Sequence, residues 1–211
     1  DVSLLELVSA YGTVVNDGTA IDPILVTCIK DQKGKIIYEA KPKTTEALPY
    51  ASAYLMQQML RGGLTCPGGT SQALWRFRIF DKGTEFGGKT GTSSNHSDAW
   101  FVGVSPNLVG GAWVGGEYRS IHFRTGELGQ GSRTALPVFG YFMEQVLADP
   151  KLAPLYIAKF GNPKEKLDRQ WDCNTYMPHY SDSDSLSIFL SDSLTLNNAE
   201  ADIDIEKLLK E

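Results

Sequence analysis

Two neighbouring runs of aromatic and β-branched residues constrain the fold of this chain more than any other feature. The first run is Ala99–Val104 and the second is Leu108–Gly115, and each has the length of a strand. Pro106-Asn107 lies between them, and both residue types favour tight turns. A short turn brings the second strand back beside the first in the opposite direction. The sequence therefore predicts an antiparallel hairpin.

The segment upstream of this hairpin also fits an unrelated pattern. Gly83–Thr90 reads G-x-x-x-x-G-K-T, the pattern of a loop whose amides and lysine bind phosphates. Such a loop needs a buried apolar strand before it and a helix that begins at the Lys-Thr. Trp75–Lys82 instead alternates apolar and charged residues, which predicts a half-exposed strand, and Gly91–Asp98 is rich in residues that disfavour helix. Nucleotide binding is therefore the least favoured of three functional interpretations.

Three segments have the hydrophobic spacing of helices that turn one side to a core. They span roughly residues 4–11, 50–60 and 133–147. The first follows Ser3, which forms a capping-box pattern with Glu6, and the second is predicted to stop at Gly62-Gly63. Their apolar stripes are Leu4, Leu7, Val8 and Tyr11; Tyr54, Leu55 and Met59; and Phe139, Phe142, Met143 and Val146. With a further strand around Phe86–Thr92, these elements predict an α+β fold in which helices flank an antiparallel sheet.

A set of short motifs links the chain to a known family. Lys89-Thr90-Gly91 matches the K-T-G of penicillin-binding proteins and serine β-lactamases, a weak signal when it stands alone. Further stretches match in the same order and spacing: Val2–Gly12, Asn16–Gly18, Asp31–Glu39, Gly68–Ser71, Gly88–Thr92, Asp98–Gly103 and Pro106. On this combined signal, residues 1–150 resemble the later part of the transpeptidase domain of class A penicillin-binding proteins, the bifunctional enzymes that polymerise and cross-link peptidoglycan.

The resemblance implies a fold and a role for each residue of the motif. The family domain is built around a five-stranded sheet, whose first strands and central helix would come from sequence outside this chain. Lys89 would supply positive charge that attracts the carboxylate of the stem peptide and supports proton movement. The hydroxyls of Thr90 and Thr92 would bind that carboxylate, or that of a β-lactam, and the Thr92 N–H would form half of the oxyanion hole. Gly91 would leave the strand open to substrate.

The chain departs from the family pattern in one large respect, because the nucleophile is missing. The family attacks with the serine of S-x-x-K, and no serine in this chain has lysine at the third following position. Ser93-Ser94-Asn95 spells the S-x-N motif but directly follows K-T-G, so we interpret it as part of a loop. We therefore expect a piece of a serine transpeptidase that is inactive by itself. The alternative is a non-catalytic envelope binding or scaffold module of the same shape.

Charge divides the chain unevenly. Residues 164–211 carry 11 acidic and 5 basic side chains, a net charge of −6, whereas the whole chain carries −5. We expect residues 1–150 to be the C-terminal portion of the transpeptidase domain, 151–163 a linker, and 164–211 an acidic, Ser/Asp-rich and largely disordered tail. In the alternative, Ile203, Ile205, Leu208 and Leu209 form a short amphipathic helix that docks on a partner.

The remaining expectations concern location, partners and metals. The sequence has no apolar run long enough to cross a bilayer, and the resemblance implies that a membrane anchor and a glycosyltransferase domain lie upstream, at the periplasmic face of the inner membrane. Implied partners are peptidoglycan stem peptides, β-lactams, the upstream part of the same protein and cell-wall synthesis proteins, without nucleic acid. Cys28, Cys66 and Cys173 lack metal-site spacing. We expect no cofactor, no metal and isolated thiols, with a Cys28–Cys66 bridge as the alternative.

Overall fold

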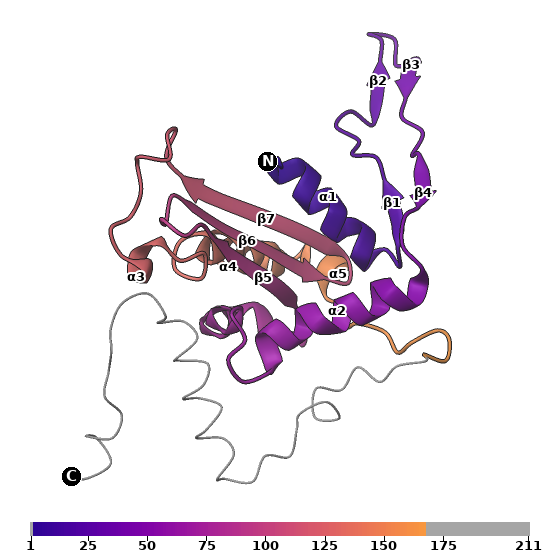
Figure 1. Cartoon of the computed structure of the whole chain (residues 1–211). Coiled ribbons are helices and arrows are strands. Elements are labelled where there is room, and N and C mark those ends of the chain that lie inside the picture. Colours follow the sequence, from indigo (N-terminus) through magenta and orange to yellow (C-terminus); the bar gives the residue numbers. More distant parts are fainter. Residues whose placement is uncertain (1, 168–211) are drawn as a thin grey trace, which may run out of the picture. The chain divides into compact units, whose positions relative to one another are not determined.

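The computed structural model describes residues 2–167, and its elements form an α+β fold (Figure 1). The helices are α1 (Leu4–Val15), α2 (Tyr50–Thr65), α3 (Gly126–Gly129), α4 (Ala135–Ala148) and α5 (Ala153–Tyr156), with the 3₁₀ helices η1 (Gln72–Arg76) and η2 (Arg78–Phe80). The strands are β1 (Thr19–Ile21), β2 (Cys28–Lys30), β3 (Ile36–Glu39), β4 (Thr44–Glu46), β5 (Gly87–Thr92), β6 (Asp98–Ser105) and β7 (Leu108–Gly115). This confirms the predicted fold class.

The centre of the fold is a three-stranded antiparallel sheet in the order β5-β6-β7. Its register is unbroken from the Gly87–Val104 pair to the Thr92–Ala99 pair, and it continues into the predicted hairpin of β6 and β7. Strand β6 lies in the middle and is the most buried strand of the three. The hairpin prediction and the strand around Phe86–Thr92 are confirmed, with β6 one residue longer at each end than the apolar run.

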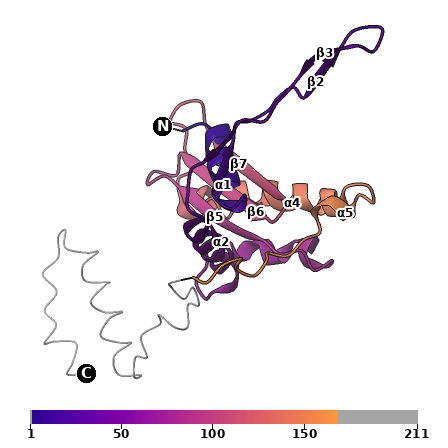
Figure 2. The ribbon, with the colours of Figure 1, turned by 90° about the vertical axis from the view of Figure 1, so that its right-hand side faces the viewer.

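Helices cover both faces of this sheet (Figures 1 and 2). On one face Phe139 of α4 packs against Phe101 with their ring centroids 5.5 Å apart. On the other face, a Cβ at Gly111 would lie 2.6 Å from the Val8 side chain of α1. A Cβ at Gly87 would likewise lie 2.8 Å from the α2 backbone. Glycines at these positions let α1 and α2 approach the strands closely. On the α4 face, Leu136, Phe139 and Met143 belong to the same buried core cluster as Phe101.

The three predicted helices form, with corrections. Ser3 and Glu6 make the predicted capping box on α1. Helix α2 continues to Thr65, so the predicted stop at Gly62-Gly63 is wrong. A Cβ at Gly63 would lie 2.8 Å from the Gly88 carbonyl oxygen, which shows that this glycine permits contact with β5 rather than capping the helix. Met59 is 71% exposed, although the predicted stripe placed it in the core.

Trp75–Lys82 is not the predicted strand but the pair of 3₁₀ helices η1 and η2. The alternating pattern was misleading because tight turns, and not a strand, bury Phe77 and Ile79, while Trp75 stays 55% exposed. Leu74 and Ile79 are fully buried, and Trp75 stacks on Phe80 with their centroids 4.2 Å apart. Turns bury side chains at irregular spacing. An alternation of apolar and charged residues therefore does not indicate a strand in this segment.

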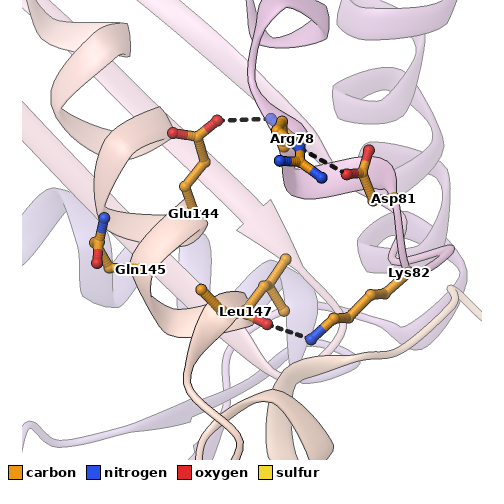
Figure 3. Close-up of a pocket in the computed structure, with 7 residues that line it drawn as sticks. Arg78, Asp81, Lys82, Glu144, Gln145 and Leu147 are labelled. Carbon is orange, nitrogen blue, oxygen red and sulfur yellow. Dashed lines mark hydrogen bonds and ion pairs between the residues drawn. The ribbon is translucent and has the colours of Figure 1, made fainter.

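Residues 78–82, which include η2, are hydrogen-bonded to the C-terminal half of α4, and the two segments line a cavity of about 310 Å³ (Figure 3). The Arg78 amide donates to Glu144 Oε1 at 2.7 Å, and the Arg78 guanidinium pairs with Asp81 at 3.0 Å. Lys82 Nζ donates to the Leu147 carbonyl oxygen at 2.6 Å, where a cation suits the end of a helix. Because these polar groups satisfy one another, we interpret the cavity as structural.

The chain after α4 returns to the globular body. Residues 151–163, which we expected to be a linker, include α5. The Glu85 amide donates to the Ala158 carbonyl oxygen at 3.0 Å, and the Phe160 amide donates to Glu85 Oε2 at 2.9 Å. The domain boundaries stay a prediction, and nearly all of the expected tail, from residue 168 onward, lies outside the described residues. No helix within residues 2–167 is long and apolar enough to span a bilayer.

Candidate active site

Strand β5 carries the predicted site and, within residues 2–167, pairs only with β6, which leaves it an edge strand. The sequence pattern of a phosphate loop does not describe this segment, because Lys89 and Thr90 lie within the strand and no helix begins there. The regular register puts Lys89 and Gly91 on the face shared with α1 and α2, and Thr90 and Thr92 on the face covered by α4. No bulge brings the four side chains to one face.

The hydrogen-bond register decides which backbone groups of β5 remain available. The Ser93 amide donates to the Asp98 carbonyl oxygen at 3.0 Å, so these two residues form a hydrogen-bonded pair. Such pairs alternate along an antiparallel ladder. The amides of Thr90 and Thr92 consequently point to the free edge of the sheet. Lys89 Nζ donates to the Thr90 carbonyl oxygen at 2.7 Å, which holds the ammonium group along the same edge.

Gly131 contacts the end of β5 and was not among the predicted site residues. Its amide donates to Thr92 Oγ1 at 3.1 Å. A Cβ on Gly131 would lie 2.6 Å from the Gly91 carbonyl oxygen and would overlap that of Trp100, so only glycine fits there. The only signal for this contact in the sequence is the close spacing of Gly126, Gly129 and Gly131.

His96 lies in the turn between β5 and β6 and is half-buried. Its backbone has a φ of 59°, a left-handed conformation that costs free energy in a residue other than glycine. A Cβ at Gly126 would be 3.3 Å from the imidazole Cε1, and one at Gly129 would overlap the His96 side chain. The imidazole therefore packs on α3 and links the turn after β5 to the Gly131 segment.

Asp98 connects this turn to β7. Its carboxylate accepts hydrogen bonds from Ser97 Oγ at 2.8 Å and from Trp113 Nε1 at 3.1 Å. The Ser97 hydroxyl, followed by the Trp113 indole, lowers the pKa of Asp98 below its ordinary value. Ser93 Oγ accepts from the Asp98 amide at 2.9 Å. Ser93-Ser94-Asn95 thus forms a turn, as we interpreted it, and the network holds the end of β5 in place.

A cavity of about 730 Å³ opens beside Thr92. Its walls include Trp100 and Trp113, whose ring centroids are 6.3 Å apart. Arg119 and Asp98 add one cation and one anion. Trp113 remains 41% exposed, which is a large apolar surface to leave in water.

The groups gathered at β5 suit the binding of an anion more than that of a metal ion. One ammonium group and two outward amides lie along the edge, and two threonine side chains lie on the adjoining face. In the part of the chain that the structure describes, no three His, Cys, Asp or Glu residues gather as a metal site would require. Cys28 and Cys66 form no disulfide. Such an edge can hold a carboxylate and stabilise an oxyanion, but it offers no serine paired with a lysine as nucleophile.

Comparisons with known proteins agree on one family. Residues 1–116 match the family described as "Penicillin binding protein transpeptidase domain". Penicillin-binding protein 1A of Aquifex aeolicus (strain VF5) is 34% identical over 170 residues, and that of Rickettsia conorii (strain ATCC VR-613 / Malish 7) is 29% identical over 173. These alignments cover 78% and 74% of this chain. The chain spans only 22% of the length of each of the two relatives.

Solved structures of the same class share the fold. The crystal structure of penicillin-binding protein 1A from Haemophilus influenzae gives a TM-score of 0.63 at 25% identity and covers 77% of this chain and 28% of its own. Penicillin-binding protein PonA1 from Mycobacterium tuberculosis gives a TM-score of 0.61 at 21% identity, over 77% of this chain and 41% of its own. The second likeness concerns the fold alone.

Proposed function

The chain belongs to the penicillin-binding protein transpeptidase family, and on that premise we propose that it supplies one wall of a serine D-Ala-D-Ala transpeptidase site. The observation that carries the proposal is the edge strand β5. It presents the K-T-G motif with the Thr92 amide at the free edge and the Lys89 ammonium group beside it. This edge would receive a stem peptide that ends in a carboxylate.

Each residue of the motif has a distinct proposed role. Lys89 attracts the substrate carboxylate and supports proton transfer near the nucleophile. Thr92 Oγ1 already accepts a hydrogen bond from Gly131, so its O–H hydrogen remains available to donate to that carboxylate. The Thr90 hydroxyl binds the same carboxylate. The Thr92 amide donates to the oxyanion that develops on the attacked carbonyl, a contribution of about 2.7–4 kcal/mol in comparable sites. Gly91 leaves room for the substrate backbone.

The nucleophile is proposed to lie in a part of the full protein outside this chain. Its serine oxygen would attack the carbonyl carbon of the penultimate D-alanine, form an ester, and release the terminal D-alanine as the leaving amine. The amine of a neighbouring stem peptide would then attack the ester and return the serine to its hydroxyl form. We infer that the segment bearing this serine lies beside the free edge of β5, because the Thr92 amide and the Lys89 ammonium group lie along that edge.

The wider setting follows from the same proposal. The full protein would carry a glycosyltransferase domain and a membrane anchor upstream and would act at the periplasmic face of the cell envelope. Its ligands would be stem peptides and β-lactams. The upstream part of the same protein and other cell-wall synthesis proteins would be its partners.

Labelling with a fluorescent penicillin tests the proposal. We expect the full-length protein to form a covalent adduct that survives denaturation, with the label on an upstream serine within S-x-x-K. The 211-residue chain, handled identically, should neither retain label nor hydrolyse the penicillin. Peptide mapping identifies the labelled residue. Label on any serine of this chain would contradict the proposal, as would an unlabelled full-length protein.

The alternative proposal is a non-catalytic binding or scaffold module of transpeptidase shape. Reading the coding sequence upstream of Asp1 separates the two. A scaffold would lack S-x-x-K and S-x-N there, whereas the transpeptidase must contain both. A full-length protein with neither motif would establish the scaffold interpretation.

A further inference from the structure

The hairpin arm, which we define as residues 22–43, extends away from the globular body in both views (Figures 1 and 2). Strands β2 and β3 pair with each other, and within residues 2–167 neither has another strand neighbour. Both outer edges therefore keep unpaired backbone donors and acceptors. An isolated pair of strands is only marginally stable in water. Such a pair is usually stabilised by a third strand or by packing against another layer.

The arm exposes many large apolar side chains for so small an element. Leu25 is 84% exposed and Ile37 is 68% exposed, the highest values within the arm. The others are Ile24, Val26, Ile29, Ile36 and Tyr38, each between 39% and 51% exposed. Ile29 and Tyr38 face each other across the two strands and share one face. Ile24, Leu25 and Val26 line one cavity with these two residues. An exposed apolar cluster of this kind is typical of a contact site.

Part of this surface is hollow. A cavity of about 360 Å³ is lined by apolar side chains that include Leu25, Ile29 and Tyr38. Lys41 and Lys43 lie at the same cavity together with Asp22. A hollow with apolar walls and lysines beside them accepts a protruding apolar side chain better than it fits the flat surface of a bilayer.

The charge of the arm indicates which residues of a ligand would lie beside an apolar side chain that enters the hollow. The arm contains five lysines and three acidic residues. The Asp31 carboxylate is occupied within the turn, where it accepts the amides of Lys33 and Lys35 at 2.9 and 2.8 Å. The lysine side chains therefore remain in excess over the available carboxylates, and the complement of this surface is acidic.

From these observations we propose that the hairpin arm binds an extended, acidic segment of another polypeptide. The segment adds as a strand to a free edge of the β2–β3 pair, places an aliphatic or aromatic side chain in the hollow, and pairs its carboxylates with the arm lysines. Backbone hydrogen bonds supply affinity, while the hollow and the lysines supply selectivity. The proposal is independent of the transpeptidase chemistry, which involves β5 on the globular body.

Fluorescence anisotropy with a defined probe tests the proposal on the full-length protein. The probe is a fluorescein-labelled decapeptide in which glutamate alternates with isoleucine, valine and phenylalanine. Its control carries lysine in place of every glutamate. We expect the acidic peptide to bind and the basic peptide not to bind. High salt should weaken binding, because the ion pairs are exposed.

Variants of exposed residues locate the site. Leu25→Asp should weaken binding on the order of tenfold or more, since it removes one apolar contact and adds a like charge to the acidic probe. The double variant Lys41→Glu, Lys43→Glu should weaken it to a similar degree. Leu155→Asp is the matched control, because Leu155 is 60% exposed on α5 and lies outside the arm. Unfolding midpoints check that the variants remain folded.

Three results would overturn the proposal. One is a full-length protein that does not bind the acidic probe. Another is equal binding by Leu25→Asp and the unaltered protein. The last is cosedimentation with vesicles of anionic phospholipid that depends on Leu25 while the peptide is not bound, because this identifies a membrane as the ligand of the arm.

Discussion

The Gly131 amide donates a hydrogen bond to Thr92 Oγ1 across 39 residues of sequence, at 3.1 Å. This contact ties the segment before α4 to the last residue of β5. Because Thr92 Oγ1 accepts this hydrogen bond, the O–H group of Thr92 remains available as a donor to another group. Thr92 thereby combines a structural contact with its proposed role in binding a carboxylate.

Replacing Thr92 by valine tests both roles. Thr92→Val keeps the shape of the side chain, removes the donor to the substrate carboxylate, and leaves the Gly131 amide without its acceptor. A hydrogen bond to a charged group contributes about 1.5–3 kcal/mol, so acylation of the full-length protein by a β-lactam should slow roughly 10- to 150-fold. Stopped-flow measurement of the acylation rate provides the test. Thr92→Ser should recover most of the rate, and Thr65→Val on α2 is the control. An unchanged rate in Thr92→Val would exclude the role in ligand binding.

Gly103 is predicted to tolerate no side chain. A Cβ at this position would overlap the Phe139 ring, which is packed beneath the sheet. Gly103→Ala should destabilise the protein by about 1–3 kcal/mol through overpacking. The opposite result is expected for Gly12→Ala, because Gly12 lies inside α1 with no atom within 4 Å of a Cβ. That change should stabilise by about 0.5–1 kcal/mol. Urea denaturation measures both, and an equal effect of the two substitutions would contradict this account of the packing.

Two phenylalanines on α4 should respond differently to truncation. Phe139 is 3% exposed and contacts Phe86 and Phe101, whereas Phe142 is 51% exposed. Phe139→Ala should cost about 3–5 kcal/mol of unfolding free energy. Phe142→Ala should change it by less than about 1 kcal/mol if this face of α4 stays in water in the full protein. A large loss for Phe142→Ala there would show that another segment covers this face.

The pH dependence of stability should reveal Asp98. Its pKa is lowered in the folded protein, first by the hydrogen bond from Ser97 and then by that from Trp113. Its carboxylate therefore contributes stability that is present above the ordinary pKa of aspartate and is lost as the pH falls through the lowered pKa. Asp98→Asn should cost most near neutral pH, and the difference from the unaltered protein should shrink toward about pH 3. Trp113→Phe, which keeps a ring but removes one donor, should give a smaller change of the same kind. Unfolding curves at several pH values test this, and a constant difference between the proteins would refute it.

Patterns of neighbouring residues correctly predicted the elements that depend on only a few consecutive residues. The runs at Ala99–Val104 and Leu108–Gly115 predicted the hairpin, because the pleat and the turn are local consequences of those residues. Ser3 and Glu6 predicted the start of α1 for the same reason. The K-T-G motif, surrounded by its companion motifs, indicated the family and the strand on which Lys89, Thr90 and Thr92 lie.

Tertiary packing decided what these local signals left open. Gly62-Gly63 looked like a helix stop, but Gly63 is a place where α2 meets β5, and the helix continues. Trp75–Lys82 alternated like a strand, yet it forms turns that bury Phe77 and Ile79 and leave Trp75 exposed. Phe142 shares the spacing of the α4 core residues but lies beyond the width of the buried stripe.

The sequence by itself determined the antiparallel hairpin, the strand that carries the K-T-G motif and the lack of S-x-x-K within these 211 residues, since each depends on residue types close together in the chain. Only the tertiary structure determined that Gly131 and His96 join the end of β5 and that the Thr92 amide faces the free edge. Those properties depend on which strand pairs with which and on how closely distant segments pack. Local residue preferences do not encode such long-range contacts, because these contacts form only when the whole core is buried.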